Sequence, residues 1–194
     1  ASDSAIAGSG NGTQAFGGTS GAAPMVSGAA ALLLSASPAP LDPLTVKARL
    51  MGTAETDVYT NPATQPGLLA PVTRIGGGEV RVDAASSATT LAYDSTPGTV
   101  PIPSLSFGYH TVAGPTALER QLTIRNTSSQ SRTYTLTPTF RYADDEASGA
   151  VRPSIVGGNS VAIAAGGTAT VTVRLDIDPA GLPDWPFNRI VGTG

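Results

Sequence analysis

The chain has 194 residues, so one or two small domains are expected, and a hydrophobic share of 40% is enough for packed cores. Its net charge of −3 and pI near 5.0 argue against a nucleic-acid partner. The absence of cysteine excludes a disulfide framework and a thiolate metal site. Charged residues make up only 13%, and Ser, Thr, Asn and Gly supply much of the polarity, as is common in secreted bacterial proteins.

The first part of the chain predicts a loop followed by an apolar helix. Residues 1–17 are rich in Ser, Gly, Ala and Asn and predict a loop with a short strand near 5–7. From about Ser20 to Ser35 apolar residues occupy every face, which predicts a helix buried inside a larger domain. Pro24 is expected in its first turn, where few N–H bonds are lost. The longest apolar run, residues 29–34, is too short to cross a bilayer, so no transmembrane segment is predicted.

A second helix is predicted from its start signal. Asp42 can cap the helix and Pro43 can occupy its first position. Apolar residues at helical spacing then continue to about Thr53. We place the end of this first region near Ala92.

After residues 95–98, which form a Ser-Thr-Pro-Gly turn signal, the pattern changes to period two. Alternation at 121–125, 134–137 and 168–175, with Asn- and Gly-rich turns between, predicts antiparallel strands of a β-sandwich. No final strand is evident after Asp184-Trp185-Pro186, so this domain is expected to be incomplete.

Ser20 is the candidate catalytic residue. It lies between a Gly-rich loop and the first apolar helix, where unpaired N–H groups and the helix dipole stabilise negative charge. A hydroxyl there can attack a carbonyl while its own N–H helps to hold the oxyanion. A serine at such a junction is more commonly an N-cap, and position alone favours that interpretation.

Seven residues at fixed spacing favour the nucleophile. The stretch resembles the catalytic-serine motif of the subtilisin-like serine peptidases, G-T-S-x-A-x-P-x-V-x-G, at Gly18, Thr19, Ser20, Ala22, Pro24, Val26 and Gly28. The resemblance implies a serine endopeptidase that forms an acyl-enzyme on Ser20. It also implies that Thr19, Gly18 and Phe16 lie beside the substrate cleft and the oxyanion site.

The family's triad runs Asp, His, Ser along the chain, so the Asp, the His and the oxyanion Asn are expected before residue 1. The chain is therefore expected to be the C-terminal part of a larger enzyme and to be inactive alone. The resemblance implies an α/β fold for 1–92, the C-terminal part of the peptidase domain, and an all-β, fibronectin type III-like sandwich for 93–194. It also implies a protein or peptide substrate and an extracellular or cell-envelope location. No cofactor or metal site is predicted; the resemblance allows calcium, without a site.

Other polar residues have simpler explanations. His110 is the only histidine and falls in the strand-rich part, where a surface or loop role is favoured over a general base. Asp42 and Asp83 are helix-start residues, and Asp144-Asp145-Glu146 predicts a solvated turn rather than a metal site.

Two alternative functions stay open. One is a non-catalytic scaffold or binding segment of a cell-surface protein. The other, ranked lower, is a lipase or esterase with a G-x-S-x-G elbow, which needs a hydrophobic strand directly before Ser20.

Overall fold

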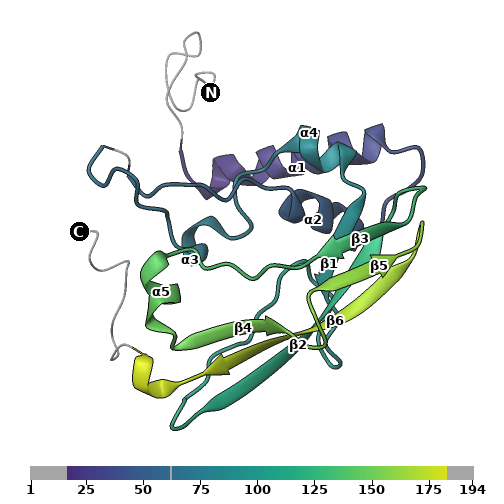
Figure 1. Cartoon of the computed structure of the whole chain (residues 1–194). Coiled ribbons are helices and arrows are strands. Elements are labelled where there is room, and N and C mark those ends of the chain that lie inside the picture. The colour runs from purple at the N-terminus through teal and green to yellow at the C-terminus, as the bar shows by residue number, and fades with distance from the viewer. Residues whose placement is uncertain (1–16, 62, 183–194) are drawn as a thin grey trace.

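The computed structural model describes residues 17–61 and 63–182, and Figure 1 shows their arrangement. We call residues 17–89 the helical region and residues 90–182 the β region. The helical region contains α1 (Thr19–Ala36), α2 (Pro43–Gly52), α3 (Val72–Ile75) and α4 (Val82–Ser87). The predicted short strand near 5–7 and the segment after Asp184 lie outside the described residues. Helices α1, α2 and α4 pack together on one side of the sheets (Figure 1).

Helix α2 begins as its sequence predicts. The Asp42 carboxylate accepts hydrogen bonds from the Thr45 backbone N–H at 3.0 Å and from the Thr45 hydroxyl at 2.6 Å, and Pro43 occupies the first turn. Thr45 and Ala48 are the buried residues of this helix. The predicted cap is confirmed, because it depends only on neighbours in the sequence.

The β region holds six strands in two antiparallel sheets. One sheet has the order β1-β2-β6-β4, formed by β1 (Thr90–Asp94), β2 (Thr116–Asn126), β6 (Thr168–Ile177) and β4 (Val151–Ile155). The other pairs β3 (Arg132–Thr135) with β5 (Ser160–Ile163). Helix α5 (Ala143–Ser148) and a 3₁₀ turn (Pro179–Gly181) complete the region.

Strands β2, β3 and β6 overlap the three predicted stretches, whereas β4 and β5 carry no strong sequence signal. Strand β4 contains Pro153, which cannot donate to a sheet ladder. It is tolerated because β4 is an edge strand that pairs only with β6.

Asn126 joins the two sheets. Its side chain is fully buried at the end of β2. The amide nitrogen donates to the carbonyls of Gln130 at 2.7 Å, Ile163 at 3.2 Å and Ala164 at 3.1 Å. The amide oxygen accepts from the N–H and the hydroxyl of Ser128 at 3.0 and 2.7 Å. Every polar atom of this buried side chain is therefore satisfied, as burial requires.

The junction between the regions is short. Only Ala88 and Thr89 separate α4 from β1, and the boundary expected after Ala92 falls inside β1. The Thr127 N–H donates to the Thr89 carbonyl at 2.8 Å, and Arg132 donates to the Thr89 hydroxyl at 2.8 Å. The first residues of the sheet thus follow directly from the last helix of the helical region.

Candidate functional site

Ser20 is the second residue of α1 and is exposed. Backbone N–H groups in the first turn of a helix point along its axis, and those of the first residues have no carbonyl partner within the helix. No hydrogen bond joins the Ser20 hydroxyl to another described residue. The hydroxyl is therefore accessible at the positive end of the helix dipole, where an oxyanion is stabilised.

Gly18, not Ser20, is the N-cap of α1. Its φ of 120° and ψ of 169° lie in a region that favours glycine, and no side chain caps the helix. Its carbonyl accepts from the N–H groups of Gly21 at 3.0 Å and Ala22 at 3.2 Å. The simple capping explanation for Ser20 is thus removed, since the cap position belongs to a residue without a side chain.

Thr19, the first residue of α1, is exposed beside Gly18 and Ser20. The structure thus brings three of the four site residues together at one helix end, as adjacency in the sequence requires. Phe16, the fourth, lies outside the described residues. The residues before Gly17, where an α/β-hydrolase elbow would need most of its strand, also lie outside the described residues, and residues 17 and 18 form no strand.

Pro24 lies in the second turn of α1 rather than in the first, because the helix begins at Thr19. A helical residue at this position would donate its N–H to the Ser20 carbonyl, four residues earlier, and proline has no N–H to donate. The Ser20 carbonyl thus lacks its usual helical donor. The sequence predicts Pro24 in the first turn, where few such bonds are lost. In the structure the missing bond is the one to the carbonyl of the candidate nucleophile.

The other titratable candidates lie in other elements of the chain. The exposed ring of His110 bonds through Nε2 to the Phe107 carbonyl at 2.5 Å, in the segment between β1 and β2. Hydrogen bonds from Thr45 lower the pKa of the Asp42 carboxyl, in keeping with a cap. Asp83 is exposed in the first turn of α4, and residues 144–146 lie in the first turn of α5.

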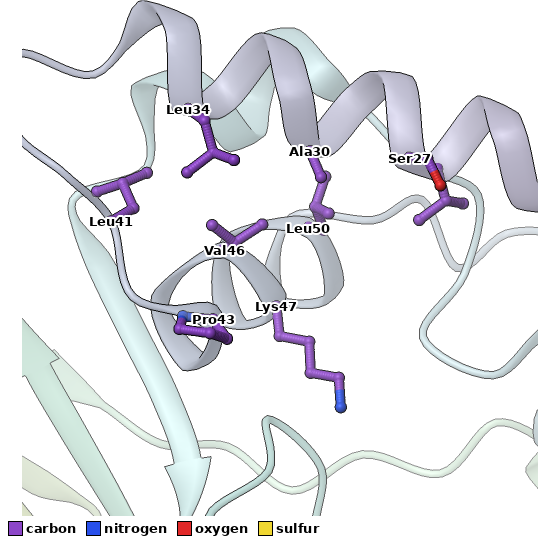
Figure 2. Close-up of a pocket in the computed structure, with 9 residues that line it drawn as sticks. Ser27, Ala30, Leu34, Leu41, Pro43, Val46, Lys47 and Leu50 are labelled. Carbon is purple, nitrogen blue, oxygen red and sulfur yellow. The ribbon is translucent and has the colours of Figure 1, made fainter.

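Two apolar grooves flank α1. The first has a volume of about 410 Å³ and lies between α1 and α2, as Figure 2 shows, with Ala30 and Leu34 facing Val46 and Leu50. The Lys47 side chain extends away from α1 (Figure 2). The second, of about 610 Å³, includes Met25, Leu32 and Val80 on another flank. Ser20 lines neither groove, so neither is a substrate site built around the serine.

Within the described residues α1 is largely exposed, and its predicted burial inside a larger domain stays a prediction. Only Ala29 and Leu33 are buried, whereas Met25 is 72% exposed and Leu32 is 60% exposed. By length and composition, α1 is also the one described helix that could cross a membrane, unlike the short apolar run considered from the sequence. The core helix of a soluble protein can also meet these criteria of length and hydropathy. They therefore do not identify α1 as a transmembrane span.

A charged hollow of about 360 Å³ lies at one end of the larger sheet, lined by Arg152, Arg174 and Asp176 among others. Arg174 pairs with Asp176 at 2.8 Å and with Glu119 at 3.3 Å. The hydrogen bond from Arg174 lowers the pKa of Asp176 and in turn raises the pKa of Arg174. These charges already satisfy one another on an exposed surface, which is typical of a surface ion network.

Comparison with known proteins places residues 5–109, more than half of the chain, within the model of the subtilase family, peptidase S8. A search of the curated proteins gives no match. Among solved structures, that of a FixG-related protein from Vibrio parahaemolyticus is 17% identical, with a TM-score of 0.31. The similarity covers 50% of this chain and 73% of that chain.

Proposed function

Because the chain belongs to the subtilase family, a family of serine peptidases, we propose that it is part of a serine endopeptidase whose nucleophile is Ser20. The observation that carries the proposal is the position of Ser20. Ser20 has an exposed hydroxyl that does not cap the helix. It lies in the first turn of an apolar helix, within a seven-position motif of that family. The substrate class is a protein or peptide, as the family implies.

The mechanism assigns each local group a task. The Ser20 Oγ attacks the scissile carbonyl while a histidine takes its proton, and an acyl-enzyme forms and is later hydrolysed. The Ser20 N–H donates to the developing oxyanion at the helix N-terminus. Gly18 and Thr19 border the place where the substrate backbone lies, and the missing Cβ of Gly18 leaves room for close approach.

The histidine and aspartate of the triad, with the oxyanion asparagine, are proposed to come from sequence before residue 1. His110, the only histidine here, lies after Ser20 in the chain and bonds to its own loop, which does not match the family order. The proposal also includes a fibronectin type III-like β region and an extracellular or envelope location, the latter supported by the composition.

Replacing Ser20 with alanine in the intact parent enzyme tests the nucleophile. Hydrolysis of a chromogenic peptide should fall by about 10⁶ in kcat, the size of the effect in subtilisin itself. The matched control is Ser27→Ala, an exposed serine of the same helix whose hydroxyl donates to the Ala23 carbonyl at 3.0 Å, and it should retain activity. An active Ser20→Ala parent would refute the assignment.

The 194-residue chain on its own should show no turnover that depends on Ser20. The same assay, run with the wild-type chain and its Ser20→Ala variant, measures this. Turnover that disappears in the variant would show that the chain supplies its own general base and would direct attention to His110.

A further inference from the structure

Arg141 of the β region reaches into the helical region. It lies in the segment between β3 and α5, which passes below α3 in Figure 1. Its guanidinium donates to three backbone carbonyls: Nε to Ala70 at 2.5 Å, Nη1 to Thr56 at 2.9 Å and Nη2 to Val58 at 3.1 Å. These partners are separated from Arg141 by 71 to 85 residues in sequence.

The neighbouring side chain makes a similar contact. The Tyr142 hydroxyl donates to the Leu69 carbonyl at 3.0 Å. We call the carbonyls of Thr56, Val58, Leu69 and Ala70 the carbonyl cage. Two residues that are consecutive in the β region thus contact four carbonyls of the helical region.

The cage exists because the chain folds back on itself. The Ala70 N–H donates to the Val58 carbonyl at 2.7 Å, and the Thr60 N–H donates to the Leu68 carbonyl at 3.0 Å. The paired segments bring carbonyls from both sides of the turn toward one point. Among the described residues, one isolated bridge, Tyr59 with Leu69, and local hydrogen bonds around Asn61 and Gln65 also hold this turn.

The chemistry of the cage selects a guanidinium. Arginine presents five N–H donors in a rigid plane, so one side chain can serve three carbonyls in fixed directions. A lysine ammonium carries the same charge on a flexible stem and cannot reproduce this fork. No carboxylate forms an ion pair with Arg141 among the described residues, so carbonyl dipoles are its partners there.

We propose that the carbonyl cage is a binding site for the Arg141 guanidinium, and that the β region thereby holds residues 56–60 and 68–70 in their folded conformation. The β region then stabilises the folded conformation of these segments of the helical region. The proposal does not depend on the assignment of Ser20, and its test needs no activity.

Amide hydrogen exchange in the full chain tests this stabilisation. The amides of Thr60 and Ala70 report directly, because both donate within the turn. In Arg141→Ala their exchange should become at least ~10-fold faster, since several charge-assisted bonds are lost, while amides in β2 and β6 keep their rates. Arg141→Lys should accelerate exchange at these two amides as Arg141→Ala does, because an ammonium keeps the charge but cannot donate to the three carbonyls as a guanidinium does.

The matched control is Arg152→Ala, which removes an arginine that donates to the carbonyl of Gly149 at 2.9 Å inside the β region. It should leave the exchange of Thr60 and Ala70 unchanged. Unchanged exchange in a folded Arg141→Ala chain would overturn the proposal, and so would equal acceleration at Thr60, Ala70 and the β2 amides. If Arg141→Ala does not fold, Tyr142→Phe removes a single hydroxyl, and unchanged Ala70 exchange in both Tyr142→Phe and Arg141→Lys would overturn it.

Discussion

Helix α1 and strand β2 are the longest helix and the longest strand of the described chain, and their burial differs. Helix α1 has 18 residues and buries only Ala29 and Leu33. Strand β2 has 11 residues, pairs on both sides with β1 and β6, and buries Thr123, Ile124 and Asn126. The apolar composition of α1 predicts burial more strongly than that of β2, yet the helix is the more exposed element.

The two elements differ in what their backbones require. A helix satisfies its N–H and C=O groups internally, so α1 can form with few neighbours. A strand satisfies them only through other strands, so the formation of β2 requires its neighbours β1 and β6. Composition alone therefore does not say how much of an element's surface the same chain covers. Substitutions in β2, in α1 and at the cap of α2 test this comparison.

The largest effect is expected from Asn126→Ala in β2. The variant removes all five side-chain hydrogen bonds and leaves three carbonyls without this donor, so unfolding free energy should fall by about 3–5 kcal/mol. Urea unfolding measures the loss. Asn159→Ala, at an exposed turn position, is the control and should change stability by less than about 0.5 kcal/mol. A loss below about 1 kcal/mol for Asn126→Ala would mean that the two sheets do not depend on this residue.

An intermediate effect is expected from α1, where two neighbouring leucines provide a matched pair. Leu33 is 1% exposed and Leu32 is 60% exposed. Leu33→Ala should cost about 2–5 kcal/mol through lost burial and a cavity, whereas Leu32→Ala should cost less than about 0.5 kcal/mol. The same unfolding assay compares them, with an identical change in helix propensity. Equal losses would show that another surface covers the Leu32 side of α1 in solution.

The smallest effect is expected from the cap of α2. Asp42→Ala should cost about 1 kcal/mol, while Asp42→Asn keeps an acceptor and should cost less. Hydrogen bonds from Thr45 lower the folded-state pKa of Asp42, so the charged cap stabilises the fold above the unfolded-state pKa of about 3.9. That stabilisation is lost as the pH falls through the lower folded-state pKa. Unfolding of wild type and Asp42→Asn, compared at pH 6 and at a pH well below the unfolded-state pKa of about 3.9, should therefore converge in acid. If the difference in unfolding free energy stayed the same at both pH values, the charge of Asp42 would not contribute to the cap.

Local signals were predictable and distant contacts were not. The Asp42-Pro43 start, the extent of α1 and the alternation behind β2 and β6 depend on neighbouring residues, and the structure confirms these elements. Strand β4 was missed because Pro153 interrupts its pattern. Within the candidate site, adjacency alone groups Gly18, Thr19 and Ser20. The role of Gly18 as N-cap and the lost donor to the Ser20 carbonyl needed the observed start of α1, and the Arg141 contacts needed the packing of segments 71 or more residues apart.

The two-residue link between α4 and β1 has a consequence for motion. Domains that rotate against each other usually do so about exposed, flexible linkers. Ala88 and Thr89 are both half-buried, and Thr89 is bonded to Thr127 through its carbonyl and to Arg132 through its hydroxyl. A hinge at Thr89 itself would have to break both bonds before the sheet could swing away from the helices. The two bonds of Thr89 therefore limit how far the sheet can rotate about this residue.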